Sequence, residues 1–287
     1  PHWNHRNGLG GDKVRVIRAR GDYVWVGSWT GGVSRIHIRT GAVTRYTAAD
    51  GILDDRITNL FFDREQRLWV GTPLGLFRST GSESRTFEQV SIPGELPDDG
   101  YYRMLQDRQG RYWIGSGRGL LILDGTEWRR YRMPDGLADD WVSRLVEATD
   151  GSVWISYRRA TALTRLRYAN GRIRAQADTP APRPDVTFFL ERDRQGRIWR
   201  GGSLGVDVLA GGAWSHRSQD DGLIWDDCAS GFQADEGGIW IGTSRGLAHC
   251  RLGQEPARHV APQVVFNAVE FGVGTRKGPL NVIDYAD

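Results

Sequence analysis

Residues 55–76 read DRITNLFFDREQRLWVGTPLGL, and recognisable variants of this stretch recur along most of the chain. Its tryptophan returns in steps of 44, 44, 41, 45 and 41 residues, at Trp25, Trp69, Trp113, Trp154, Trp199 and Trp240. A period of this length is typical of an array of structural repeats, each of which is one small unit of secondary structure. The chain therefore has to be interpreted as a set of repeats before any single motif is considered.

An aspartate opens each repeat, fourteen residues before the tryptophan in five units and thirteen before it in the first. These residues are Asp12, Asp55, Asp99, Asp140, Asp185 and Asp226. Two positions after each aspartate are mostly apolar: the second residue after it and the fifth, which are Val14 and Ile17 in the first unit. This spacing predicts a first strand with one buried face. A polar turn, such as residues 107–110, then leads into the run that holds the tryptophan, which predicts a hairpin with a second strand.

Two further strands complete each unit. A turn containing glycine opens a third strand, such as residues 119–123, and a short fourth strand, such as residues 128–131, precedes the next aspartate. Four short antiparallel strands in about 43 residues are typical of one propeller blade, whereas helical repeats would need long runs with apolar spacing near 3.6, which we do not find. We predict an all-β fold, a β-propeller of four-stranded antiparallel blades.

Six repeats are visible, at about residues 8–50, 51–94, 95–136, 137–181, 182–222 and 223–260, so we assign residues 1–260 to the propeller. The last repeat is expected to have its fourth strand at residues 256–260. The chain starts without Met, and Trp3–Arg6 aligns with the fourth strand of a preceding blade. We therefore expect a seven-bladed propeller whose seventh blade lies upstream; the alternative is that six blades close on themselves.

The residues around the repeated aspartates resemble those of a known family. The sequences NGLGGD (7–12), DGILDD (50–55) and DGLADD (135–140), each followed by an apolar strand and a Trp-(Ile/Val)-Gly-(Thr/Ser) stretch, resemble the two-component regulator propeller repeat over residues 7–252. In that family the repeats build seven-bladed propellers in the extracytoplasmic sensor region of bacterial histidine kinases, hybrid two-component proteins and diguanylate cyclases. The resemblance implies a periplasmic location, a sensor function and ligands that are often carbohydrates. It is also compatible with a homodimer of the full-length receptor. Residues 261–287 resemble the opening of the β-sandwich domain that links propeller and membrane helix in such proteins.

Composition excludes several other classes. The net charge is +3, and the 38 basic residues are nearly all arginines that alternate with acidic residues, which argues against nucleic-acid binding. No run of eighteen apolar residues predicts a membrane span. The two cysteines, Cys228 and Cys250, fall on the first and third strands of one unit, too far apart for a disulfide, so we expect two reduced thiols. We predict no metal site and no cofactor, because two sulfurs without clustered histidines are a poor ligand set.

Catalysis has little support from the sequence. The six histidines lie in different units without a repeated catalytic spacing. Paired carboxylates such as Asp54–Asp55 and Asp139–Asp140 could supply an acid and a base, but a feature that recurs in every unit is better explained as a turn cap. We predict a non-catalytic ligand-sensing domain of a membrane-bound signalling receptor. The alternatives are a secreted propeller enzyme (a polysaccharide lyase, glycoside hydrolase or lactone lyase) and a protein-interaction scaffold.

A ligand site is expected on one rim of the propeller. The connection that leads into each first strand and the turn after each repeat tryptophan should emerge on the same rim, and their residues vary while the scaffold repeats. Aromatic residues there offer flat faces for a sugar ring, and arginines can pair with carboxylate or sulfate groups, so the preferred ligand is a small molecule or an anionic oligosaccharide. The predicted residues are Trp29, Tyr101, Arg118, Trp141, Tyr157, Arg158, Trp225 and Arg245. The alternative is that these are ordinary rim residues, with solvated arginines and tryptophans packed on their neighbours.

Overall fold

The structure is a computed structural model, and it describes residues 3–81, 85–94, 99–176, 184–233 and 238–250. Within these ranges the chain folds into strands joined by turns and four short 3-10 helices, with no α-helix. The strands form six separate antiparallel sheets in chain order, five with four described strands and the sixth with three. The all-β propeller with four-stranded blades is confirmed; the predicted last strand at residues 256–260 and the predicted domain at 261–287 lie outside the described residues.

The blades are numbered in chain order, and their strands are as follows. Blade 1 contains β1 (Val14–Arg20), β2 (Tyr23–Ser28), β3 (Val33–His37) and β4 (Val43–Tyr46); blade 2 contains β5 (Asn59–Phe62), β6 (Leu68–Gly71), β7 (Leu76–Ser79) and β8 (Phe87–Gln89). Blade 3 contains β9 (Tyr101–Gln106), β10 (Tyr112–Ser116), β11 (Gly119–Asp124) and β12 (Glu127–Tyr131); blade 4 contains β13 (Val142–Glu147), β14 (Val153–Tyr157), β15 (Leu163–Ala169) and β16 (Arg172–Gln176). Blade 5 contains β17 (Phe189–Arg192), β18 (Ile198–Gly201), β19 (Val206–Ala210) and β20 (Ala213–Arg217); blade 6 contains β21 (Cys228–Gln233), β22 (Ile239–Thr243) and β23 (Gly246–Cys250). The 3-10 helices are η1 (His5–Asn7), η2 (Ala48–Asp50), η3 (Met133–Asp135) and η4 (Gln219–Asp221).

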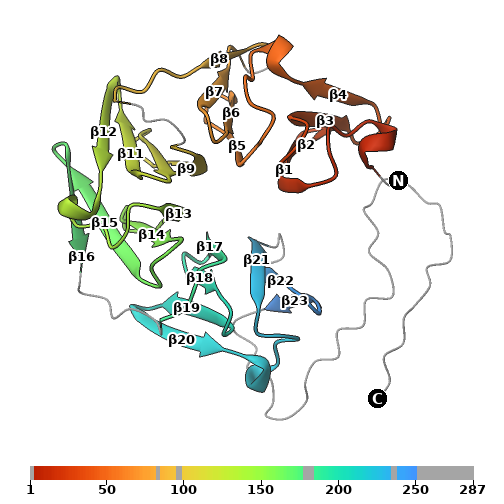
Figure 1. The fold of residues 1–287 in the computed structure, drawn as a ribbon. Coiled ribbons are helices and arrows are strands. Elements are labelled where there is room, and N and C mark those ends of the chain that lie inside the picture. Colours follow the sequence, from red (N-terminus) through yellow and green to blue (C-terminus); the bar gives the residue numbers. More distant parts are fainter. Residues whose placement is uncertain (1–2, 82–84, 95–98, 177–183, 234–237, 251–287) are drawn as a thin grey trace, which may run out of the picture.

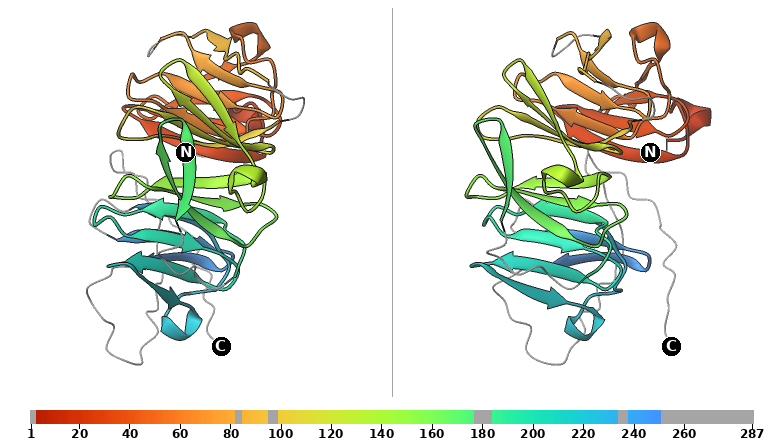
Figure 2. Two further views of the ribbon diagram at one scale, coloured as in Figure 1. Left: turned by 90° about the vertical axis from the view of Figure 1, so that its left-hand side faces the viewer. Right: turned by 60° about the vertical axis from the view of Figure 1, so that its left-hand side comes forward.

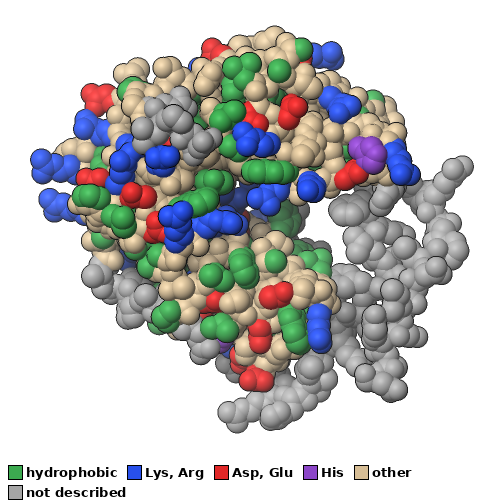
Figure 3. All heavy atoms as spheres, viewed as in Figure 1, with side chains coloured by type: hydrophobic (Ala, Val, Ile, Leu, Met, Phe, Trp, Pro, Cys, Tyr) green, Lys and Arg blue, Asp and Glu red, His purple; other side chains and the backbone are tan. Residues whose placement is uncertain are grey.

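The blades stand around a common centre. The first strand of each blade contacts the first strand of the next, from β1 through β5, β9, β13 and β17 to β21, so these strands line the inside of the ring (Figure 1). Seen from the side, the sheets follow one another face to face (Figure 2). Drawn as spheres, the molecule is hollowed at this centre, and Lys and Arg side chains gather around the hollow (Figure 3).

The repeat tryptophans of blades 2, 3 and 5 are buried between neighbouring blades. Trp69 and Trp113 are fully buried and Trp199 is 1% exposed. Trp69 of blade 2 packs with Tyr101 and Ile114 of blade 3, and Trp113 packs in the same way against blade 4. Each of these three tryptophans therefore buries its ring against the blade that follows it in the chain.

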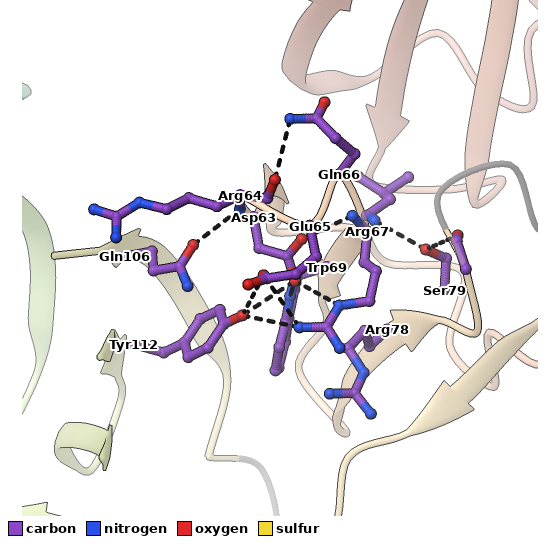
Figure 4. Close-up of polar contacts among 12 residues, drawn as sticks. Asp63, Arg64, Glu65, Gln66, Arg67, Trp69, Arg78, Ser79, Gln106 and Tyr112 are labelled. Atoms are coloured by element: carbon purple, nitrogen blue, oxygen red, sulfur yellow. Dashed lines mark hydrogen bonds and ion pairs between the residues drawn. The ribbon is translucent and has the colours of Figure 1, made fainter. Parts of the chain in front are cut away.

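An aspartate in the turn between the first two strands holds each of three tryptophans in place (Figure 4). The Oδ2 atom of Asp63 accepts hydrogen bonds from the Trp69 indole and the Arg67 guanidinium, both at 2.8 Å, and from the Tyr112 hydroxyl of the next blade at 3.1 Å. The same arrangement recurs in blades 3 and 5, in the sets Asp107, Arg111, Trp113 and Asp193, Arg197, Trp199. The turn therefore joins neighbouring blades as well as neighbouring strands.

The Asp63 network predicts acid sensitivity. Burial alone would raise the pKa of Asp63, but hydrogen bonds from Trp69 and Arg67 and the Arg67 charge outweigh it and hold the pKa below 3.8. Because the folded pKa is lowered, the stabilisation is fully present above the unfolded value and is lost as the pH falls through the folded value. We expect Asp63→Asn to cost about 1.5–3 kcal/mol at neutral pH and less as the pH falls toward about 3, measured by urea unfolding.

The exposed Glu88→Gln is the control for this comparison, since Glu88 pairs with Arg78 at the surface. It should change stability little at any pH. A constant difference between wild type and Asp63→Asn across the pH range would show that the Asp63 charge does not stabilise the turn.

Two predictions at the start of the chain are wrong. The predicted fourth strand at Trp3–Arg6 is instead a loop followed by η1, because the Asn4 side chain accepts a hydrogen bond from the Arg6 backbone and caps a helical turn. Val14 and Ile17 were expected to be buried, but they are 41% and 55% exposed. Val16, between them in sequence, is the residue that packs against blade 2.

Ile17 is exposed because of its position in the ring. The described blades leave the arc open between blade 1 and blade 6 (Figure 1). Ile17 follows Val16, which packs against blade 2, so its side chain points to the opposite face of β1. In blade 6, Phe232 is 72% exposed and follows Gly231, which lies against Phe189 of blade 5. No described strand covers either face. The structure thus shows six blades, and the seventh blade stays a prediction.

Candidate functional site

The two sets of connections that were expected to share a rim do lie together. Backbone hydrogen bonds join the residue after the repeated aspartate to the turn after the tryptophan: Trp29 N–H to Lys13 C=O at 2.8 Å, Gly117 N–H to Gly100 C=O at 3.1 Å and Arg158 N–H to Trp141 C=O at 2.9 Å. In blade 6 the Ser244 N–H donates to the Asp227 side chain at 2.9 Å. We call these connections the loop rim; it comprises residues 12–13, 29–32, 55–56, 72–75, 99–100, 117–118, 140–141, 158–161, 185–186, 202–204, 226–227 and 244–245.

The repeated aspartates hold the loop rim together. Asp140 and Asp226 accept hydrogen bonds from the Met133 and Gln219 backbone N–H groups, at 2.8 and 2.7 Å, at the start of the preceding 3-10 helix. Asp99 instead accepts from the Ser116 hydroxyl at 2.9 Å and Asp185 from the Leu204 N–H at 3.0 Å, in the turn after the tryptophan. These contacts agree with the turn-cap hypothesis and give the carboxylates a structural role.

Aromatic and arginine side chains meet on the loop rim of blades 3 and 4. The half-buried Trp141 stacks on Tyr102, with ring centroids 5.5 Å apart and an interplanar angle of 30°. The guanidinium groups of Arg158 and Arg159 lie 5.1 and 5.2 Å from the Trp141 ring centroid. We call Tyr102, Trp141, Arg158 and Arg159 the rim patch. It combines a flat apolar ring with two positive charges, which is a suitable surface for an anionic ring compound.

The other predicted tryptophans are also paired with arginines. Arg15 lies 5.2 Å from the Trp29 ring centroid in blade 1, and Arg245 lies 3.7 Å from that of Trp225 in blade 6. Trp141 contacts Arg158 at blade 4 and Trp225 contacts Arg245 at blade 6, so the two pairs belong to different blades. Arg118 is exposed on the rim of blade 3. The predicted residues are therefore distributed over several blades and do not form one cluster.

Two predicted site residues are corrected by the structure. Tyr101 is fully buried and packs with Trp69, and Tyr157 is 2% exposed and donates its hydroxyl proton to Thr164 Oγ1 at 2.9 Å. Neither ring can stack on a ligand. Tyr102 is the residue that reaches the rim, because a β-bulge at the start of β9 leaves it unpaired between Tyr101 and Arg103.

Sequence reasoning also missed arginines on the innermost strands. Arg18 of β1, Arg103 of β9 and Arg144 of β13 lie on strands that line the centre of the ring. The signal that could have found them is the presence of an arginine inside the first strand of blades 1, 3 and 4.

The remaining chemistry of the described residues is sparse. Cys228 and Cys250 are free thiols, as predicted, and burial raises their pKa values to about 12 and about 11, which keeps both protonated at neutral pH. Within the described ranges no three His, Cys, Asp or Glu side chains gather as metal ligands would. The described residues also include no helix of the length and apolar character that crossing a membrane requires.

Comparisons with known proteins agree with the repeat pattern. The model of the family described as two component regulator propeller matches residues 51–73, which contain β5 and β6 of blade 2, and residues 95–118, which contain β9 and β10 of blade 3. The chain has no match among curated proteins.

Solved structures share the fold at low sequence identity. The extracellular domain of a candidate hybrid two component system from B. thetaiotaomicron is 16% identical, with a TM-score of 0.69 over 84% of this chain and 33% of that chain. The extracellular domain of a candidate one component system from the same organism is 18% identical, with a TM-score of 0.66 over 83% and 33%. A virginiamycin B lyase from Staphylococcus aureus is 13% identical, with a TM-score of 0.65 over 86% and 87%. This chain spans about a third of the two extracellular domains, and these similarities show the fold alone.

Proposed function

Because blades 2 and 3 carry the two component regulator propeller repeat, we propose that this chain is the ligand-sensing part of a bacterial membrane-bound signalling receptor. It lies on the extracytoplasmic side of the inner membrane, in the periplasm, and it binds its ligand without catalysis. The similarity in fold to extracellular domains of two component and one component systems supports this assignment.

The rim patch is the observation that carries the proposed ligand site. It lies where the connections of two blades meet, and the Arg158 and Arg159 side chains hold positive charge against the Trp141 ring. A sugar ring can stack on the exposed part of the indole while its carboxylate or sulfate pairs with a guanidinium. An acidic oligosaccharide satisfies both features, and a neutral one satisfies only the first.

A propeller enzyme is the second candidate, because the chain also shares its fold with a virginiamycin B lyase over most of both chains. The carboxylates that could act as acid and base are engaged elsewhere. Asp99, for example, accepts from the Ser116 hydroxyl and pairs with Arg130 at 2.5 Å. This use of the repeated carboxylates favours binding over turnover.

Calorimetry against a panel of acidic oligosaccharides tests the proposal. We expect at least one member to bind and to be recovered unchanged after prolonged incubation. Trp141→Ala should weaken that binding about tenfold or more, since it removes the stacking surface. Arg118→Ala probes the neighbouring rim of blade 3. Arg129→Ala on the outer strand β12 is the control, because Arg129 is exposed and pairs with Glu127 of the same strand at 2.7 Å.

Two results would overturn the proposal. Binding that is insensitive to both Trp141→Ala and Arg118→Ala would remove this site from consideration. Sustained product formation that survives repurification, and disappears with a single carboxylate or histidine substitution, would instead establish the enzyme.

A further inference from the structure

Arginines from three different blades converge at the centre of the ring. Arg103 of β9 pairs with Glu191 of β17 at 2.7 Å, although blade 4 stands between blades 3 and 5, so the two side chains meet across the central space. Burial, and then the Arg103 charge, lowers the pKa of Arg18 to about 10 and that of Arg144 to about 10. The Arg103 guanidinium therefore lies close enough to repel those of Arg18 and Arg144, which both remain charged at neutral pH. We call these three residues and Glu191 the central cluster.

The central cluster has an excess of positive charge. Glu191 is the carboxylate that acts on all three arginines, and Arg15 and Arg158 add further positive charge beside Arg144. The hydrogen bonds of Arg144 go to the Phe188 and Ser143 carbonyl groups, at 2.8 and 2.9 Å, and that of Arg18 goes to the Ile17 carbonyl at 2.9 Å. These contacts orient the guanidinium groups without neutralising them.

Several other arginines of the chain that are wholly or partly buried pair with carboxylates. Arg67, Arg111 and Arg197 each bond an aspartate of their own turn, and Arg200 bonds Asp207. Burying like charges together costs free energy unless an opposite charge compensates them. The central cluster departs from this rule at the place where the molecule is hollowed and Lys and Arg side chains gather (Figure 3). An anion from solution would supply the missing charge.

The central cluster is continuous with the rim patch. Trp141 directly precedes β13, and Arg144 is the third residue of that strand. The Arg158 charge acts both on Tyr102, which stacks on Trp141, and on Arg144. A ligand whose ring rests on Trp141 can therefore extend an acidic group inward to Arg144.

We propose that the sensed ligand is an oligosaccharide with at least two acidic groups, one of which binds Arg18, Arg103 and Arg144 in the centre of the ring while a sugar ring stacks on Trp141. This inference rests on the proposed function and adds to it the position at which the ligand binds and the minimum number of charges that the ligand carries. Glu191 holds Arg103 in the absence of ligand and competes with the acidic group for it. The site therefore discriminates against singly charged and neutral saccharides.

The test compares three probes by calorimetry: a disaccharide with one uronate and one sulfate, the same disaccharide without the sulfate, and inorganic sulfate. We expect the doubly charged disaccharide to bind most tightly. Arg18→Gln and Arg144→Gln should each weaken it about tenfold to a hundredfold, because each removes a charge-assisted contact. Glu191→Gln should tighten it, since it removes the competing carboxylate, and Arg129→Gln should leave it unchanged.

Thermal unfolding of each variant, together with Arg144→Lys, separates loss of binding from loss of folding. The lysine keeps the charge and should retain part of the affinity.

Equal affinity for the two disaccharides, or binding that depends on Trp141 but not on Arg18 and Arg144, would overturn the inference and leave the proposed function standing. Inorganic sulfate that binds through the arginines when no saccharide does would overturn the ligand class. Failure of every probe on the folded protein would overturn both the inference and the ligand proposed for the rim patch.

Discussion

Replacing Trp113 by alanine is expected to destabilise the protein by about 3–5 kcal/mol, measured by urea unfolding at equilibrium. The ring is fully buried between blades 3 and 4, in one cluster with Val142, Leu145 and Ile155. Alanine would leave a cavity at this interface. It would also remove the indole N–H that donates to Asp107 Oδ2 at 2.8 Å, so a buried carboxylate would lose a donor.

Trp113→Phe separates the two effects. Phenylalanine keeps most of the apolar contact but cannot donate to Asp107, so it should cost less than alanine and more than a surface substitution. Trp128→Ala is the matched control on the outer strand β12, where the ring is only partly buried and packs at the edge of a cluster. A cost below about 1 kcal/mol for Trp113→Ala would mean that the ring is not a wedge between blades.

The period of the tryptophans is sufficient to predict the blades, because each blade must bury the same ring against its neighbour. It is not sufficient to predict what the turn does. The sequence indicates a polar turn at residues 63–66, but Asp63 and Trp69 meet only because the hairpin folds them together across β5 and β6. The Tyr112 hydroxyl comes from another blade, so this contact depends on the ring as a whole.

The candidate site shows the same limit at the level of single residues. The shared rim could be predicted, since it follows from strand direction alone. The choice of Tyr101 over Tyr102 was wrong, because a β-bulge reverses the direction of one side chain and leaves no certain mark in the sequence. Arg103 and Arg144 occupy ordinary polar positions of a strand, and only the curved arrangement of the blades brings them to one centre.

Blade 5 replaces an apolar pair of the repeat by a buried ion pair. Arg200 of β18 lies opposite Asp207 of β19, at the positions that Ile114 and Leu121 occupy in blade 3. The Arg200 side chain is 1% exposed, and it donates to Asp207 Oδ2 at 3.0 Å, to Thr187 Oγ1 at 2.9 Å and to the Asp185 carbonyl. A buried charge of this kind is costly once its partner is removed.

Asp207→Leu should therefore destabilise the protein by about 3–5 kcal/mol, because it leaves the guanidinium without its carboxylate in the core. The double variant Arg200→Ile with Asp207→Leu restores the pair of blade 3, and we expect it to be as stable as wild type or more stable by about 1–4 kcal/mol. His216, whose Nδ1 lies 2.8 Å from Asp207, loses this contact in both variants, but its side chain is partly exposed and can hydrogen-bond to water. Urea unfolding of the wild type, the two single variants and the double variant gives the coupling energy of the pair. A double variant that is no more stable than Asp207→Leu alone would contradict this expectation. It would mean that Thr187 and the Asp185 carbonyl require the guanidinium as a hydrogen-bond donor. The ion pair would then be part of a network that fixes the loop rim of blade 5, and two apolar side chains could not replace it.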